Sequence, residues 1–221
     1  MTRWETVSLA DVAEIQGGIQ KQGKRRPVEN KYPFLRVANV ARGRLILDEV
    51  HEVELFKGEL ERYRLQRGDL LVVEGNGSPD QIGRAAVWDD SIPNCVHQNH
   101  LIRVRPGEEL LPEYLGLAWN SPAVSSQVRA VAASTSGLYT LSTAKLKPIA
   151  IPYCSLDEQR RVVDLVEDHL SRLDAAITAI KAAQLREQSL RATLLAAAFS
   201  GRLTGYTGAL AARPKQELPH E

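Results

Sequence analysis

Two parts of this sequence carry side chains that could perform chemistry or bind a charged ligand. His97-Gln98-Asn99-His100 holds two imidazoles, which could bind a metal ion or activate water. The same stretch offers the amides of Gln98 and Asn99, and such amides can form two hydrogen bonds with the edge of an adenine base. Residues 17–44 carry eight lysines and arginines against one glutamate, a local net charge of +7. A basic segment of this kind is typical of a protein that binds phosphates from one face.

The motifs of common enzymes do not occur in the sequence. There is no G-x-x-x-x-G-K-[ST] nucleotide-binding loop, no G-x-S-x-G elbow and no H-E-x-x-H zinc motif. The Asn-Pro-Pro-[Tyr/Phe] tetrapeptide expected of an adenine amino-methyltransferase is absent too. His97 and His100 fall in a strand-rich stretch, where they would point to opposite faces. We therefore predict no catalytic residue, no metal and no cofactor in this chain, and keep a small metal-dependent nuclease at residues 97–100 as an alternative.

The basic segment predicts contacts with DNA phosphates. Its stretch GGIQKQGKRRPVENKYP is rich in Gly, Lys and Arg, which favours a mobile loop that could lie along a DNA backbone. The predicted contacts are Lys21, Lys24, Arg25 and Arg26, with Arg36 as a further DNA-binding residue. Residues 48–61 hold six acidic residues and one lysine, and the whole chain has a net charge of only +1. A solvated charged loop is the alternative to a phosphate-binding one.

A second group of polar residues is predicted to lie near base edges. These residues fall at breaks between expected elements, where recognition loops are usually found. They are Asn76, Ser78, Gln98, Asn99, Ser136, Tyr139 and Thr140. Ordinary turn chemistry is the alternative, because Asn-Gly suits any hairpin and Ser-Thr-Ser-Gly suits any loop.

The elements that would position these side chains form a mixed α+β domain over residues 1–155. We expect helices at 8–15, 59–65, 112–120 and 121–133, and a turn that begins at Ser142 and leads through residues 143–146 to the last strand. We expect strands at 33–40, 44–47, 69–74, 85–88, 95–96, 100–105 and 148–152. Residues 201–221 contain Pro, Gly and charge, and are expected to form a poorly ordered tail.

Residues 156–200 predict one helix of unusual length. No Pro or Gly occurs from Leu156 to Phe199, a run of 44 residues that would be roughly 66 Å long as a helix. Ser155 and Glu158 form a capping-box pattern at the start, and Gly201 is suited to end the helix. A helix this long predicts a spacer, a dimerisation element, or both.

The apolar side chains of this helix predict a coiled-coil seam. Five of them follow alternating spacings of four and three residues: Val166, Leu170, Leu173, Ile177 and Ile180. The strict seam then meets Gln184, Glu187 and Arg191, and the stripe shifts to Ala183, Leu190, Leu194 and Phe199. Packing of the helix along its own domain is the alternative, but one small domain could not cover so long a stripe.

Composition limits the remaining possibilities. The 221 residues leave room for one domain of about 150 residues and the helix. No run reaches 18 apolar residues, and the first residues lack the apolar core of a signal peptide. Cys95 and Cys154 are the only cysteines, which suits a reducing compartment. We therefore expect a cytoplasmic protein.

Along nearly its whole length, the sequence resembles the specificity (S) subunits of type I restriction–modification systems, in their half-length form with one target-recognition domain. The resemblance rests on short patterns that occur in the family's order. They are Trp4, Val7, Leu9, Asp11, Val12, Ile15 and Gly17-Gly18; Tyr32 to Val40; Gly68 to Val72; Ile82 to Ala85; Leu156, Glu158, Gln159 and Val162-Val163; and Ala198 to Thr204. Tyr153-Cys154 stands where the family usually has two prolines, and we expect this to alter a loop only.

The resemblance implies a function without catalysis in this chain. Such subunits read DNA and usually carry two domain-plus-helix units in tandem, whereas this sequence has one. A second copy would then supply the missing half by antiparallel pairing of the helices, and the homodimer would read a palindromic bipartite site. A fragment of a longer protein is the alternative. The implied partners are double-stranded DNA, methyltransferase (M) subunits and a motor-nuclease (R) subunit. S-adenosylmethionine, ATP and Mg would belong to those partners. A scaffold that binds only proteins is a further alternative, against which the basic segment argues.

Overall fold

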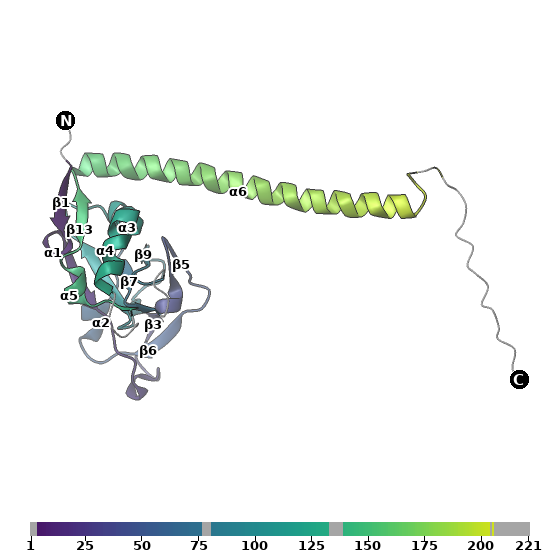
Figure 1. Cartoon of the computed structure of the whole chain (residues 1–221). Helices are drawn as coiled ribbons and strands as arrows, with labels where there is room; N and C mark the ends of the chain where they lie inside the picture. The colour runs from purple at the N-terminus through teal and green to yellow at the C-terminus, as the bar shows by residue number, and fades with distance from the viewer. Residues whose placement is uncertain (1–3, 77–80, 133–138, 204, 206–221) are drawn as a thin grey trace, which may run out of the picture. The chain divides into compact units, whose positions relative to one another are not determined.

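The computed structural model describes residues 4–76, 81–132, 139–203 and 205 (Figure 1). The chain divides into two compact units, Met1–Val166 and Glu167–Glu221, so that the division falls within the long helix. Within the described ranges, no helix is both long and apolar enough to cross a membrane. The predicted tail beyond Gly205 lies outside the described residues.

A four-stranded antiparallel sheet is the centre of the first unit. Its order is β2 (Ala13–Gly17), β11 (Leu101–Pro106), β7 (Leu70–Val73) and β9 (Ala85–Val87). Successive side chains of a strand point to opposite faces, and here both faces are buried. Leu70 and Val72 therefore join one hydrophobic cluster, and Leu71 and Val73 join another. This explains why β7 reads as a continuous apolar run.

Helices cover the first face of this sheet. They are α3 (Pro112–Asn120), α4 (Pro122–Ala132) and α5 (Thr143–Leu146), and β1 (Glu5–Ser8), α1 (Leu9–Val12) and β13 (Ala150–Tyr153) complete this layer. Gly83 is needed here for two reasons. Its φ is +66°, and a Cβ at this position would lie 2.2 Å from a methyl group of Val128. The buried indole of Trp119 also donates to the Gly83 carbonyl at 2.8 Å, so the turn and the helix layer are fixed together.

The second face carries the basic and acidic segments. A small sheet has the order β10 (Val96–His97), β3 (Lys31–Leu35), β6 (His51–Glu54). Around it lie η1 (Gly23–Arg25), η2 (Val37–Asn39), the hairpin β4 (Val40–Ala41) and β5 (Arg44–Leu45), and α2 (Glu59–Tyr63). Two further strands, β8 (Gly75–Asn76) and β12 (Tyr139–Thr140), pair with each other. The apolar side chains Ile19, Phe34, Val53, Leu55 and Val96 form a separate cluster under the basic segment.

Most predicted elements occur, and two expected ones are wrong in part. The helix expected at 8–15 is helical only over Leu9–Val12, because Ala13–Gly17 pairs with β11 as a strand. The strand expected at 33–40 ends at Leu35. There the amide of Asn39 accepts the Arg36 N–H at 2.8 Å and donates to the Ile46 and Glu49 carbonyls at 2.9 and 2.8 Å. These contacts turn the backbone into η2. The strands β1 and β6 were not predicted.

The long helix α6 runs from Leu156 to Phe199, as the sequence predicted. The Ser155 hydroxyl accepts the Glu158 N–H at 3.4 Å, and Gly201 ends the helix with φ of +76°. One fully buried amide, that of Gln159, fastens the start of α6 to the domain. It accepts the Leu111 N–H at 2.8 Å and donates to the carbonyls of Glu109 and Cys154 at 3.0 and 2.9 Å. The Gln of the Leu-x-Glu-Gln pattern therefore has a structural role.

The second unit leaves the predicted seam exposed. Leu170 and Leu173 are 48% and 56% exposed, and Ile177 and Ile180 are 40% and 59% exposed. Ion pairs one turn apart support the polar side of the helix: Arg172 with Asp168 and Arg191 with Glu187, each at 2.8 Å. The predicted seam is therefore a long exposed apolar stripe on the described part of this unit.

Candidate nucleic-acid interface

The acidic segment of residues 48–61 folds against the basic segment. The Arg25 guanidinium donates two hydrogen bonds to the Glu59 carboxylate, at 2.7 and 2.8 Å, and lies 4.9 Å from the centre of the Phe56 ring. The hydrogen bonds from Arg25 lower the pKa of Glu59 to about 2. Arg25, which was predicted to contact a phosphate, therefore has a carboxylate partner within the protein.

Glu54 fixes the backbone of the basic loop just after Arg25. Its carboxylate accepts the N–H groups of Val28, Glu29 and Asn30 at 2.7, 3.2 and 2.8 Å. These backbone hydrogen bonds lower the pKa of the Glu54 carboxyl. The sequence predicted a mobile loop here, whereas the structure gives this loop a defined path held by two acidic side chains.

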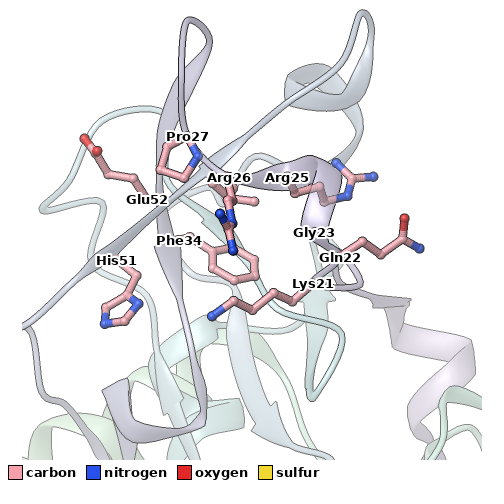
Figure 2. Close-up of a pocket in the computed structure, with 10 residues that line it drawn as sticks. Lys21, Gln22, Gly23, Arg25, Arg26, Pro27, Phe34, His51 and Glu52 are labelled. Atoms are coloured by element: carbon pink, nitrogen blue, oxygen red, sulfur yellow. The ribbon is translucent and has the colours of Figure 1, made fainter.

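The folded loop and β6 enclose a hollow of about 630 Å³, shown in Figure 2. Its basic side chains are Lys21, Arg25 and Arg26 of the loop, together with the imidazole of His51 on β6. Phe34 and Pro27 give it apolar walls. In Figure 2 the Arg26 side chain reaches the Phe34 ring from above and the Lys21 side chain passes below it, whereas Arg25 extends to the right, away from His51. The sequence did not predict His51 as a residue of this site. His51 belongs to the acidic segment and reaches the hollow only because β6 pairs with β3.

Two other residues that were predicted to bind DNA, Arg36 and Lys24, also have contacts within the protein. Arg36 donates to Glu49 at 3.3 Å, and Glu49 also contacts the His51 ring at 2.7 Å. The hydrogen bond with His51, helped by Arg36, lowers the pKa of Glu49. The ammonium group of Lys24 lies 5.6 Å from the centre of the Phe56 ring. Lys24 itself is exposed to solvent.

The predicted base-reading residues come together from three separate parts of the chain. Gln98 bridges to Ile19, and the Asn99 N–H donates to the Ile19 carbonyl at 2.9 Å, so both lie beside the start of the basic loop. Gly18 permits this approach, because a Cβ there would lie 2.4 Å from the backbone of His97 and Gln98.

Glu74 joins the remaining parts. Its N–H donates to the His100 carbonyl at 2.9 Å, and its own carbonyl accepts the Leu141 N–H at 2.7 Å. Strands β8 and β12 pair next to it, with Asn76 opposite Tyr139 and Gly75 opposite Thr140. Ser78 and Ser136 lie outside the described residues, as does the side chain of Asn76. The described part of the predicted set thus shares one region with the basic loop.

The two histidines do not form a common site. His97 is fully buried, and its Nδ1 lies 3.1 Å from the Leu101 carbonyl. Burial, with the nearby Arg103 charge, lowers the pKa of His97 to about 4. His100 is exposed and contacts Glu74 at 3.0 Å. Among the described residues, no three His, Cys, Asp or Glu side chains are grouped as metal ligands would be.

Comparison with known proteins decides the family. Residues 1–187 match the family described as "Type I restriction modification DNA specificity domain". This chain belongs to that family. It is 28% identical over 194 residues to the EcoKI specificity subunit of Escherichia coli (strain K12), and 26% identical over 204 residues to the StySPI specificity subunit of Salmonella potsdam. These matches cover 87% and 91% of this chain, but 41% and 43% of the relatives. The specificity-domain chain therefore spans less than half of their length.

Solved structures show the same fold at lower sequence identity. A chain from a study of complex assembly and conformational transition in a type I R-M system aligns with a TM-score of 0.67 at 20% identity, covering 89% of this chain and 45% of that one. The HsdS subunit from Thermoanaerobacter tengcongensis aligns with a TM-score of 0.55 at 18% identity, covering 78% and 38%. The mixed α+β domain followed by a long helix is thus the fold of these neighbours.

Several residues of the resemblance patterns have structural roles that sequence reasoning did not assign. The Arg84 guanidinium donates to the Val40 and Val37 carbonyls at 2.7 and 3.0 Å, which fixes η2 and β4 against β9. Arg105 binds the buried carboxylate of Asp69 through two hydrogen bonds of 2.6 and 2.7 Å. These roles could have been suspected from the sequence, because each charged residue stands next to or within an apolar strand pattern. A charge that is buried with such a strand requires a partner.

Proposed function

We propose that this chain is a DNA sequence-recognition subunit of a type I restriction–modification complex and reads one half of a bipartite site. The match to the family of specificity domains over residues 1–187 carries the proposal. The basic hollow, with the neighbouring Gln98, Asn99 and Tyr139, supports it on the domain itself. In this proposal the chain has no catalytic activity of its own, acts in the cytoplasm and binds double-stranded DNA.

The two groups of polar residues divide the work. Lys21, Lys24 and Arg26 provide affinity through phosphates, which carry no sequence information. A second group distinguishes the bases, because side-chain amides and hydroxyls form hydrogen bonds with groups on base edges. Its members are Gln98, Asn99, Tyr139 and Thr140. Asn76, Ser78 and Ser136 belong to the same proposed set by sequence.

We also infer that α6 pairs with α6 of a second copy as an antiparallel coiled coil. The proposed contacts are the exposed residues Leu170, Leu173, Ile177 and Ile180, with Val166, Leu190 and Leu194. The charge of the helix supports this direction. Residues 157–168 hold five acidic and two basic residues, whereas residues 181–202 hold four basic and one acidic residue. Antiparallel pairing places opposite charges together, and parallel pairing would place like charges together. The paired helices would then set the distance between two half-sites.

The proposed partners supply the chemistry. M subunits would dock on the helices and domain, and an R subunit would join them for cleavage. S-adenosylmethionine, ATP and Mg would be bound by these subunits. The two alternatives make different predictions: a nuclease at His97–His100 would cut DNA with a divalent metal, and a protein-only scaffold would bind no DNA at low salt. The burial of His97 disfavours the first.

Selection from a random duplex library tests the proposal. The chain, assembled with its M subunit, is expected to enrich one sequence with two inverted half-sites at a fixed spacing. Replacement of Gln98 and Asn99 by Ala should change the enriched sequence or remove the enrichment, while Gln127→Ala, a change on α4 outside the predicted base-reading set, should leave it unaltered. Retention of DNA without any sequence enrichment would contradict the proposed reading role.

A further inference from the structure

We propose that the hollow lined by Lys21, Arg26 and His51 is a preformed site for one backbone phosphate of DNA, and that Arg25 is a positioning residue which holds this site in shape. The inference deepens the proposed function and rests on it. It assigns His51 to the interface. Arg25 also lines the hollow, but its guanidinium binds Glu59, so the proposal gives it no direct contact with DNA.

Two basic side chains of the hollow, Lys21 and Arg26, lack the carboxylate partners that other basic residues in the described parts of the chain have. Across the described parts of the chain, Arg25 and Arg36 bind carboxylates, but no carboxylate pairs with Lys21 or Arg26. Glu52 also lines the hollow, and in Figure 2 its carboxylate points away from the Lys21 amino group. Glu49 is shared between His51 and Arg36. An anion in the hollow would therefore offset the repulsion between Lys21 and Arg26 and form charge-assisted hydrogen bonds with both.

The shape of the hollow fits a sugar–phosphate unit better than an isolated anion. Its volume of about 630 Å³ exceeds the space that one phosphate group needs. Phe34 and Pro27 provide apolar surface beside the cations, against which the carbon atoms of a deoxyribose can pack. The hollow is also open at the surface of the protein, because Lys21 and Arg26 are both exposed residues, so a duplex can reach it without a rearrangement.

The acidic segment preorganises the site. The paired hydrogen bonds from Arg25 to Glu59 hold one end of the loop, and the three backbone hydrogen bonds to Glu54 hold the next residues. Arg26 lies between these two attachments. Ordering the loop before binding lowers the entropic cost of binding. Arg25 thus acts on the DNA through the position of its neighbour.

A salt titration tests the phosphate site. The measured quantity is affinity for duplex DNA carrying the selected sequence, over a range of salt concentrations, for the full chain assembled with its M subunit. Each phosphate neutralised contributes about 0.9 to the slope of log affinity against log salt. The double variant Lys21→Gln with Arg26→Gln is expected to flatten the slope by about 0.9, because both residues bind the same phosphate. The control Lys57→Gln with Arg62→Gln removes equal charge outside the hollow and should leave the slope unchanged. Equal slopes for the wild type and the first variant would overturn the proposal.

A charge exchange tests the role of Arg25. Arg25→Glu and Glu59→Arg should each lower affinity, because each breaks the pair and places like charges together. The combination of the two should restore most of the lost affinity, since it rebuilds the pair in reverse. A direct contact of Arg25 with phosphate predicts instead that the combined variant stays as weak as Arg25→Glu. Thermal melting of each variant separates a loss of contact from unfolding, and a variant that does not fold is replaced by Arg25→Gln with Glu59→Gln.

The outcomes distinguish this inference from the proposed function. If the unmodified complex binds no DNA sequence selectively, the proposed function is wrong. If it binds selectively and neither the salt slope nor the charge exchange behaves as described, only the assignment of the hollow and of Arg25 is wrong. DNA with single neutral methylphosphonate groups should identify one position whose effect is lost in the Lys21→Gln, Arg26→Gln variant.

Discussion

Replacement of Gln159 is expected to destabilise the recognition domain by releasing the start of α6. The side chain is fully buried and forms three hydrogen bonds, with Leu111, Glu109 and Cys154. Each bond contributes about 1 kcal/mol, and a buried group left unpaired costs about 1–3 kcal/mol. Cys154 is buried, whereas Glu109 is exposed and its carbonyl can bind water instead. Gln159→Ala should therefore cost about 2–4 kcal/mol, mostly at Leu111 and Cys154.

Urea unfolding of the chain, followed by circular dichroism, measures this loss. A domain of this size loses about 2–4 °C of melting temperature per kcal/mol, so thermal unfolding should shift by roughly 4–16 °C. The matched control is Arg160→Ala, the next residue along α6, whose ion pair with Asp157 at 2.8 Å is exposed. That change should cost less than about 1 kcal/mol. A Gln159→Ala variant as stable as Arg160→Ala would refute the view that this amide fastens the helix.

Three further outcomes follow from the same structure. Leu173→Glu places a charge in the proposed seam and should convert a dimer of about twice 24.4 kDa into a monomer in light scattering; an unchanged mass would show that the seam is assigned wrongly. Arg25 lowers the pKa of Glu59 to about 2. The wild type should therefore be more stable than Glu59→Gln by its full margin above about pH 5, and this margin should decline as pH falls toward 2. A difference in urea unfolding that does not change with pH would argue against the ion pair. Burial lowers the pKa of His97 to about 4, so its ring should stay neutral in NMR spectra at pH 6. The domain should lose stability as pH falls from about 6.5 toward 4, because the unfolded state binds the proton more readily. An imidazolium signal from His97 at pH 6 would contradict the buried environment.

The helices were predictable where local signals are strong. The absence of Pro and Gly, with Ser155 and Gly201 at the ends, gave the bounds of α6, Leu156–Phe199. Pro122 at the first position of α4 marked the start of that helix in the same way. These signals lie within a few residues of the element that they define, so a single sequence contains them.

The strands at 13–17 and 51–54 were not predictable from local pattern. Ala13–Gly17 continues a helix-like sequence and becomes a strand only because β11 offers a partner. In β6, only Val53 is buried, so the alternation that marks a strand is almost absent.

The charge available at the candidate site could not be predicted from local sequence either. A count over residues 17–44 gives +7, but it cannot detect that Glu59, 34 residues after Arg25, neutralises that arginine. The meeting of Gln98 with Ile19, and of Glu74 with Leu141, likewise depends on topology. The sequence gives the residue types, whereas their contacts within the protein depend on the fold.

The central claim is that this chain determines which DNA sequence its complex acts on. Sequencing of methylated bases in cells that express the M subunit, with and without this chain, tests it most directly. The account predicts methylation only when both are present, at one bipartite motif whose two halves are inverted copies at a fixed spacing. Methylation at the same sites without this chain would contradict the account.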